Sequence, residues 1–145
     1  MSVSFINKLF KSKSNDDFCT AVVLAAGNSQ RMGKDKILMP LGGAPVIAHT
    51  LKALQSAECI DEIVVVTKYE RLQELADICH DHGISKASKV VVGGKTRLES
   101  SLIGVSNADE RAKYIAIHDG ARPFVTNSLI ERVVHSCLLY TSPSP

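Results

Sequence analysis

Long apolar runs are missing from the sequence, and so is a large excess of charge of either sign. No stretch approaches the roughly 18 to 20 consecutive apolar residues of a membrane helix, so we expect a soluble protein that does not enter a membrane. The 17 Lys and Arg residues nearly balance the 15 Asp and Glu residues, which leaves a formal net charge of +2. Non-specific nucleic-acid binding usually needs a much larger basic excess, so nucleic acid is not an expected partner.

Closely spaced cysteines and a secretion signal are also absent. The four cysteines, at positions 19, 59, 79 and 137, form no CxxC pair, and no histidine stands at metal-ligand spacing from them. This pattern is typical of reduced, mostly buried thiols. The first residues lack an apolar segment of about 7 to 15 residues followed by a cleavage site, so secretion is not supported. We therefore expect a cytoplasmic protein.

The composition is that of one globular domain with a distinct segment at each end. Hydrophobic residues make up 45% of the 145 residues and charged residues 22%, which predicts a packed core. Residues 1–17 are polar and rich in Ser and Lys, and we interpret them as a flexible N-terminal extension. After Ser136 the sequence CLLYTSPSP ends in a Ser-Pro repeat that cannot continue a helix, so residues 137–145 are expected to form a tail outside the domain.

Between these ends, apolar runs alternate with helical patterns in the order of βαβ units. Strands are expected at residues 20–26, 62–67, 89–92 and 114–118. All four are continuously apolar, which predicts that helices cover both faces of each strand. Helices are expected at residues 44–57, 69–82 and 97–107, with a last one starting near Asn127. The sequence therefore predicts an α/β fold with a doubly wound, mostly parallel sheet.

In such a fold, ligands bind where the strands end. Three of the four segments that follow the predicted strands are rich in Gly, Arg, Lys or Asp, namely LAAGNSQRMGKDK, VVGGKTR and IHDGARP. Right-handed crossovers bring these segments to one edge of the sheet, so we expect the chemistry there. A sheet that stops after four strands also leaves an edge open, which we interpret as a sign that a portion of the domain is missing.

The first of these segments has the features of a phosphate-binding loop. Residues 25–27 (AAG) have little side-chain bulk, so a polyanion can approach their backbone amides. Arg31 offers a planar fork of donors for phosphate oxygens, and Lys34 or Lys36 adds a compact charge. The loop matches neither the GxxxxGK[ST] of P-loop proteins nor the GxGxxG of dinucleotide-binding folds. A glycine-rich surface loop with solvated cations is the alternative interpretation.

Taken together, the segments resemble a known enzyme family. The run AAGNSQRMG, followed by Lys36 and PLGGAPVIAHTL, resembles the signature of nucleotidyltransferases that activate sugar phosphates with a nucleoside triphosphate. GGKTRLES and IHDGARP look like the 2-C-methyl-D-erythritol 4-phosphate cytidylyltransferases of the non-mevalonate isoprenoid pathway. The resemblance covers about residues 20–136 and corresponds to the N-terminal half or so of that family's domain. It implies a Rossmann-like (GT-A-like) layer sandwich over residues 18–136, truncated on its C-terminal side, with residues 137–145 outside the family.

The resemblance also implies roles for residues at the expected ligand-binding edge. Arg31 and Lys36 match the catalytic pair that stabilises charge on the triphosphate in the transition state, and Lys36 fits the family spacing better than Lys34. The nucleotide-binding positions are matched by Ala25, Ala26, Gly27, Gly94, Arg97 and Ser100. Lys95 departs from the acidic or small residue that the family often has there, which argues against a direct contact of its side chain with the base.

Asp119 directly follows the last predicted strand, and the resemblance assigns it to the metal site for Mg²⁺, the cofactor it implies. A carboxylate there holds Mg²⁺ against phosphate oxygens. Judged without the resemblance, Asp119 is better explained as a turn or cap residue. Arg122 precedes Pro123, which favours an extended backbone at Arg122 and makes its guanidinium a candidate substrate contact. His118 is expected to be structural.

The implied activity is transfer of a cytidylyl group from CTP to 2-C-methyl-D-erythritol 4-phosphate, with release of pyrophosphate, by a homodimeric enzyme. A phosphate monoester has a second pKa near 6, so the attack needs position and positive charge rather than a base. The alternatives are another polyol phosphate such as ribitol 5-phosphate, a nucleotide-binding fragment without catalysis, and an interaction module on an α/β scaffold. We expect the 145-residue chain alone to be nearly inactive, because the family's residues that position the sugar phosphate come from the later part of the domain.

Overall fold

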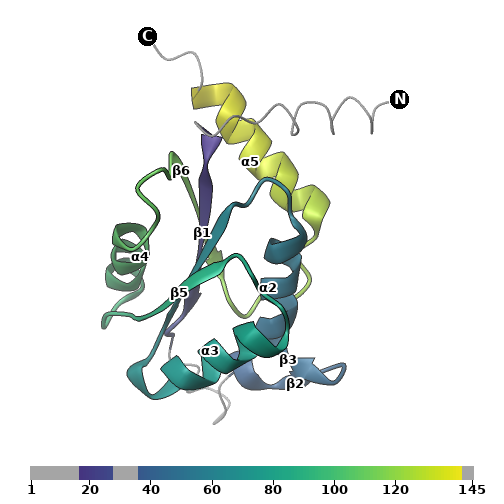
Figure 1. The fold of residues 1–145 in the computed structure, drawn as a ribbon, viewed down its shortest axis with the longest axis vertical. Coiled ribbons are helices and arrows are strands. Elements are labelled where there is room, and N and C mark those ends of the chain that lie inside the picture. Colours follow the sequence, from purple (N-terminus) through teal and green to yellow (C-terminus); the bar gives the residue numbers. More distant parts are fainter. Residues whose placement is uncertain (1–16, 28–35, 142–145) are drawn as a thin grey trace.

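The computed structural model describes residues 17–27 and 36–141, the last six of these by their backbone alone. Its centre is a four-stranded sheet with the order β5-β4-β1-β6, in which all pairs are parallel (Figure 1). The strands are β1 (Cys19–Ala25), β4 (Glu62–Thr67), β5 (Ala87–Val92) and β6 (Tyr114–Asp119). The expected α/β fold with a mostly parallel sheet is confirmed.

Burial separates the two central strands from the two outer ones. Every residue of β1 and β4 is buried, as the continuous apolar runs predict. The outer strands β5 and β6 have no such cover along their length: Val92 on β5 is 41% exposed and Ile117 on β6 is 46% exposed. The expectation that helices cover both faces therefore holds fully for the central pair and only in part for the outer pair.

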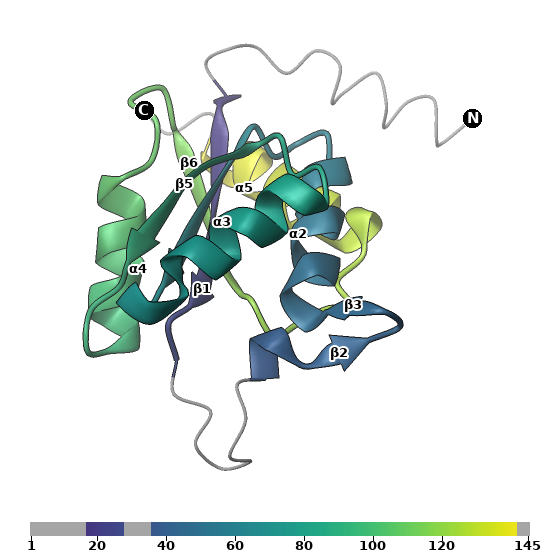
Figure 2. The ribbon, with the colours of Figure 1, turned by 60° about the horizontal axis from the view of Figure 1, so that its bottom comes forward.

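Helices pack on both faces of the sheet, as in a doubly wound fold. Helices α2 (Val46–Ser56), α3 (Leu72–Asp81) and α5 (Asn127–Thr141) lie on one face, and α4 (Arg97–Ser106) lies on the other (Figure 2). The larger core forms between the sheet and the three-helix face, with Val23, Ile47 and Leu51 among its buried side chains. The smaller core, under α4, contains Val22 and Val66.

Several boundaries differ from those expected. The predicted helix at residues 44–57 begins only at Val46, because the preceding residues form a short hairpin of β2 (Pro40–Leu41) and β3 (Ala44–Pro45). Gly42 and Gly43 make its turn with φ angles of 58° and 85°, which residues with a Cβ rarely adopt. The segment predicted as a helix from residue 69 starts as a 3₁₀ turn, η4 (Tyr69–Arg71). Strand β5 begins two residues earlier than expected, at Ala87.

The two ends of the chain are described only in part. The predicted N-terminal extension lies outside the described residues apart from Asp17. Helix α5 continues through Ser136 and ends at Thr141, ahead of the Ser-Pro repeat, so the division at residue 136 stays a prediction. Cys19, Cys59 and Cys79 are buried thiols outside any disulfide, as expected. In the part of the chain that the structure describes, no helix has both the length and the apolar character that crossing a membrane requires.

Candidate functional site

A cleft of about 410 Å³ opens where β1 and β6 end, beside the loop that follows β5. This is the edge of the sheet at which parallel strands present their carboxyl ends, where α/β proteins bind ligands. The cleft collects predicted site residues from four separate segments of the chain. They are Ala25, Ala26, Gly27, Lys36, Gly94, Arg97, Ser100 and Asp119.

The remaining predicted residues stand elsewhere or are not placed. Arg122 lines a second cleft of about 830 Å³, which shares Arg97, Asp119 and Ala121 with the first. The substrate contact expected of Arg122 would therefore fall beside the residues predicted to bind the nucleotide rather than among them. Arg31 and its rival Lys34 lie outside the described residues.

Hydrogen bonds between the strand ends hold the floor of the first cleft. The buried Thr67, at the end of β4, donates from Oγ1 to the carbonyl oxygen of Ala25 at 3.3 Å. The carbonyl of Thr67 in turn accepts from the Gly93 amide at 2.8 Å. On the other side, the Gly120 amide donates to the carbonyl of Leu24 at 2.9 Å. The end of β1, at Leu24 and Ala25, is thus tied to Thr67 on one side and to Gly120 on the other.

The loop after β5 is packed so closely that its glycines are needed for steric reasons. A Cβ on Gly93 would lie 2.6 Å from Oγ of Ser100 and 3.0 Å from Cβ of Ala26. Ser100 is 4% exposed, and its Oγ accepts from the Gly94 amide at 3.2 Å. This bond makes Ser100 a support for the loop, while its hydroxyl proton remains a donor. Gly27 is not under the same steric constraint, because no heavy atom lies within 4 Å of a Cβ placed there.

Helix α4 begins at this loop with a capping arrangement that the sequence analysis missed. Oγ1 of Thr96 accepts from the Glu99 amide at 3.0 Å, and Oε2 of Glu99 accepts from the Lys95 amide at 2.7 Å. The signal was present in the sequence, since Thr96 and Glu99 have the [ST]-x-x-[DE] spacing of a capping box. The cap fixes the start of α4, so that Lys95, Thr96 and Arg97 line the cleft.

Asp119 serves the turn after β6 and also lines the cleft. Its Oδ1 accepts from the Ala121 amide at 3.0 Å, and Thr50 donates to the carbonyl of the neighbouring Gly120 at 2.9 Å. The turn role and the ligand role that the sequence left open are thus compatible, because a carboxylate has more acceptor sites than one amide occupies.

The charge of the cleft suits a polyanion. Its lining contains the cationic side chains of Lys36, Lys95 and Arg97 against the single carboxylate of Asp119. Within the described ranges, no group of three or more His, Cys, Asp or Glu residues could hold a metal ion without other ligands. Mg²⁺ is usually bound by one or two carboxylates together with substrate phosphates. Asp119 therefore suits a metal ion that arrives with a triphosphate.

His118 precedes Asp119 and lines the second cleft. Its Nε2 is buried and has no hydrogen-bond partner among the residues that the structure describes. The pKa of His118 lies below its ordinary value of 6.5, and burial of the ring is the main cause. A hydrogen bond with the Arg122 backbone raises the pKa, but by less than burial lowers it. The ring is therefore held mainly neutral at pH 7.

Known proteins with similar sequences and folds include cytidylyltransferases. The 2-C-methyl-D-erythritol 4-phosphate cytidylyltransferase of Dictyoglomus thermophilum is 34% identical over 116 residues, which cover 80% of this chain and 50% of the relative. The crystal structure of 4-diphosphocytidyl-2C-methyl-D-erythritol synthase from Anaerococcus prevotii is 27% identical, with a TM-score of 0.72, covering 85% of this chain and 52% of that one. A structure of Rv0371c from Mycobacterium tuberculosis in complex with manganese is 22% identical and shares the fold, with a TM-score of 0.65, covering 83% of this chain and 59% of that one.

The family itself is shown by a match over most of the chain. The sequence model of the family described as IspD: 2-C-methyl-D-erythritol 4-phosphate cytidylyltransferase matches residues 19–142. The chain spans about half the length of the curated relatives it matches. The matched region contains the strands, the capped helix α4 and every residue of the cleft. The chain thus belongs to the 2-C-methyl-D-erythritol 4-phosphate cytidylyltransferase family.

Proposed function

We propose that this chain forms the nucleotide-binding half of an enzyme that transfers a cytidylyl group from CTP to 2-C-methyl-D-erythritol 4-phosphate. The observation that carries the proposal is the cleft at the strand ends, which gathers eight residues that sequence reasoning had assigned to the nucleotide, the metal or catalysis. The family match supports the same reaction. Cytosine and the polyol phosphate come from the family and not from the geometry of the cleft.

The proposed reaction is a displacement at the α-phosphorus of CTP. An oxygen of the acceptor's phosphate forms a bond to this phosphorus, and the bond to the bridging oxygen of the β-phosphate breaks. The bonding electrons leave with pyrophosphate. The attacking monoester is mostly a dianion at neutral pH, because its second pKa lies near 6. The protein therefore has to place two anions in line and to stabilise charge, and it needs no general base.

The residues of the cleft meet these needs in different ways. Ala25, Ala26 and Gly27 let the triphosphate approach backbone amides at the end of β1. Lys36, in the 3₁₀ turn η3 (Lys36–Leu38), places a positive charge at the cleft, where it stabilises charge on the phosphates as the leaving group departs. Arg31 is proposed to act with it.

The nucleoside is proposed to lie on the α4 side of the cleft. Gly94, Arg97 and Ser100 line that side, and the bond between Ser100 and the Gly94 amide fixes the loop that would contact the ribose or the base. A site that is held rigid before the ligand binds loses less entropy on binding. The hydroxyl of Ser100 keeps one donor for the ligand.

A divalent cation, Mg²⁺ by preference, is proposed to bind at Asp119 together with the phosphates. The manganese in the structure of Rv0371c supports a divalent cation on this fold. Such an ion would neutralise charge on the phosphate oxygens as the leaving group departs. Asp119 is suited to orient it, because Asp119 lines the cleft and the bond from the Ala121 amide holds its carboxylate in place.

The acceptor is proposed to lie toward the second cleft. Arg122 lines this cleft beside Asp119 and offers two parallel donors to a phosphate group. The complete enzyme is further proposed to be a cytoplasmic homodimer, which follows from the family resemblance.

The proposed reaction is tested by completing the chain. The C-terminal portion of the Dictyoglomus thermophilum relative is joined after Ser136, and CDP-alcohol formation from CTP is measured with a panel of polyol phosphates. We expect turnover with 2-C-methyl-D-erythritol 4-phosphate, and little or none from the 145-residue chain alone. Preference for ribitol 5-phosphate would overturn the acceptor assignment, and turnover with ATP equal to that with CTP would overturn the nucleotide assignment.

A further inference from the structure

The turn after β6 lines both clefts, and hydrogen bonds hold its first half in place. The Gly120 amide donates to the carbonyl of Leu24 at 2.9 Å, and Oγ1 of the buried Thr50 donates to the carbonyl of Gly120 at 2.9 Å. Oδ1 of Asp119 accepts from the Ala121 amide at 3.0 Å. Because these bonds reach β1 and α2, the start of the turn is fixed to the elements packed around it.

The end of the turn, at Arg122, is held by different bonds. The Arg122 amide donates to the carbonyl of Asp119 at 3.3 Å. The next residue, Pro123, has no amide hydrogen, so it adds no backbone donor here. The imidazole of His118 also forms a hydrogen bond with the Arg122 backbone. This bond crosses the whole turn, from the last residue but one of β6 to Arg122.

The partners of this bond define its direction. The Arg122 amide already donates to Asp119, so the carbonyl of Arg122 is the backbone group that remains for the ring of His118. A carbonyl only accepts, so the ring nitrogen donates, which agrees with the rise that this bond causes in the pKa of His118. Nε2 has no hydrogen-bond partner among the residues that the structure describes. The donor is therefore Nδ1.

The burial of Nε2 supports the same position of the proton. A neutral imidazole carries one N–H and one lone pair, and the hydrogen bond of one nitrogen decides which form is present. A proton on Nε2 would leave a buried N–H without an acceptor in the described part of the chain, and it would turn a lone pair of Nδ1 toward a carbonyl. Buried N–H groups without partners are rarer in proteins than acceptors without partners. His118 is thus expected in its Nδ1–H form, with the bare lone pair on Nε2.

From this bond and the unpaired Nε2, we infer that His118 is a positioning residue, whose Nδ1–H holds the carbonyl of Arg122 and thereby aims the Arg122 guanidinium at the phosphate of the acceptor. The inference rests on the proposed function, since it gives His118 a task in binding the acceptor. His118 acts through Arg122, which lines the second cleft, whereas the residues proposed for the nucleotide line the first. Loss of the bond should therefore weaken binding of the acceptor much more than binding of CTP.

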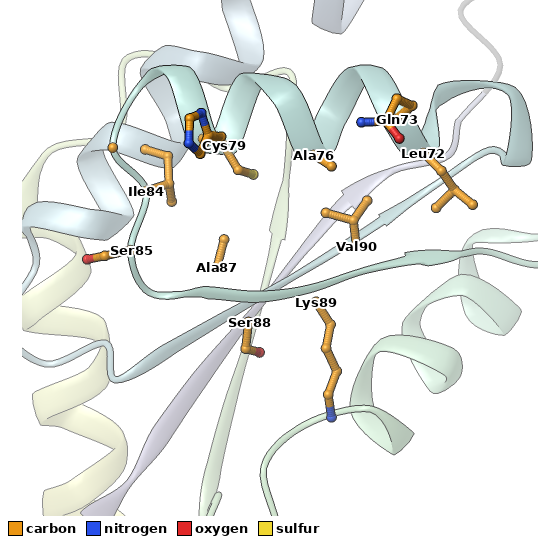
Figure 3. A pocket seen from close by; sticks show the side chains of 12 residues that line it. Leu72, Gln73, Ala76, Cys79, Ile84, Ser85, Ala87, Ser88, Lys89 and Val90 are labelled. Atoms are coloured by element: carbon orange, nitrogen blue, oxygen red, sulfur yellow. The ribbon is translucent and has the colours of Figure 1, made fainter.

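A matched control lies in the groove between α3 and β5. This groove has a volume of about 660 Å³, and Figure 3 shows Ala76 on α3 facing Ala87 and Val90 on β5 across it. His80 lines the groove, with its Nδ1 3.5 Å from Oδ1 of Asp81. The residues that line this groove line neither of the two clefts. His80 is thus a histidine to which the inference assigns no task.

The hydrogen bond is tested in the 145-residue chain at pH 7, without nucleotide or acceptor. NMR correlations between ring protons and ring nitrogens identify the protonated nitrogen, and we expect it to be Nδ1 in His118. Amide hydrogen exchange is then compared with that of His118→Leu and of His118→Asn, whose side-chain amide keeps a donor near the place of Nδ1. His118→Leu should speed exchange of the Arg122 amide about tenfold or more, with no change at Gly120, and His118→Asn should restore most of the protection.

The task of the bond is tested in the enzyme completed after Ser136. His118→Leu should raise KM for 2-C-methyl-D-erythritol 4-phosphate about tenfold or more and change KM for CTP by less than about twofold. His118→Asn should recover most of the loss, and His80→Leu should leave both values unchanged. A merely structural role of His118 would change both KM values together and would not separate the asparagine variant from the leucine variant.

Three results would overturn the inference. One is a His118 ring protonated on Nε2 alone, another is equal exchange of the Arg122 amide in the unchanged chain and in His118→Leu, and the third is an equal KM for the acceptor in the completed enzyme and its His118→Leu variant. If His118→Leu does not fold, the ring of the unchanged chain and the His118→Asn variant decide. Failure of the completed enzyme to transfer a cytidylyl group would contradict the proposed function, and the NMR measurements would still decide whether His118 holds Arg122.

Discussion

Ser100 and Asp119 each use one atom to hold the cleft's own backbone and leave the rest of the side chain for a ligand. Oγ of Ser100 accepts from the Gly94 amide, and Oδ1 of Asp119 accepts from the Ala121 amide. Such bonds stabilise the empty site, so the ligand does not have to order it. The sequence left both a structural and a functional role open for Asp119, and the structure is compatible with both, because one carboxylate oxygen holds the turn while the residue also lines the cleft.

Lys36 is expected to be the described residue whose loss affects turnover most. Removing one donor that stabilises developing charge typically costs about 2.7 to 4 kcal/mol in the barrier, which corresponds to about a hundredfold or more in rate. Lys36→Ala in the completed enzyme should therefore reduce kcat by at least that factor, measured as pyrophosphate release. Lys52→Ala, an exposed lysine on α2 outside the cleft, is the matched control and should keep normal turnover. Equal activity of the two variants would remove Lys36 from the mechanism.

Asp109 and Arg111 form an ion pair in the segment just before β6, and the pKa of Asp109 reports the strength of this pair. Nε and Nη2 of Arg111 donate to its two oxygens at 3.0 Å, and the guanidinium lies 4.7 Å from the centre of the Phe18 ring. The hydrogen bonds of Arg111 lower the pKa of Asp109 from 3.8 to about 2. The folded-state pKa is the lower one, so this pair stabilises the fold above about pH 4, and its contribution disappears as the pH falls through about 2.

An NMR titration of the Asp109 carboxyl is the direct measurement. Arg111→Gln should return the pKa toward 3.8, while Arg132→Gln, which removes an exposed arginine on α5, should leave it near 2. A wild-type carboxyl that titrates at 3.8 would show that Arg111 does not hold Asp109 in solution.

At the scale of elements, helix α4 packs closely against strands β1 and β4 at Gly104. A Cβ on Gly104 would stand 2.3 Å from Cγ1 of Val22 and 3.0 Å from Cγ2 of Val66. Overpacking of this kind costs about 1 to 3 kcal/mol. The gain in helix propensity from Gly to Ala offsets about 0.5 to 1 kcal/mol of that cost.

We therefore expect Gly104→Ala to lower the free energy of unfolding by about 1 to 2 kcal/mol, measured by urea denaturation. Leu102→Ala, on the same helix but 60% exposed, should change it by less than about 0.5 kcal/mol. A fully stable Gly104→Ala variant would mean that α4 does not pack this closely on Val22.

Strands were the elements that the sequence predicted best, for a physical reason. The apolar runs of β1 and β4 are buried throughout, so their composition alone defines them to within a residue or so. The hairpin of β2 and β3 was not predicted, because each of its strands has two residues and offers no periodicity. Helix starts at Val46 and Leu72 were placed too early, because the turns before them contain residues that also suit helices.

At the scale of the whole molecule, the sheet brings residues from four segments into one cleft, and this too could be anticipated. The rule that ligands bind at the carboxyl ends of parallel strands predicts from sequence that Ala25, Gly94 and Asp119 lie together, and all three line the cleft. The position of Arg122 in a neighbouring cleft could not be foreseen, because it depends on the turn held by Asp119 and Gly120.

The central claim, that the cleft binds CTP, is tested most directly by titrating Mg²⁺-CTP into the isotope-labelled chain and following its backbone amides by NMR. The account predicts saturable shifts at Ala26, Gly94 and Asp119, larger for CTP than for ATP at equal concentration, and none in the groove between α3 and β5. The contradicting result is an absence of shifts in the cleft, or a response to CTP confined to residues outside it.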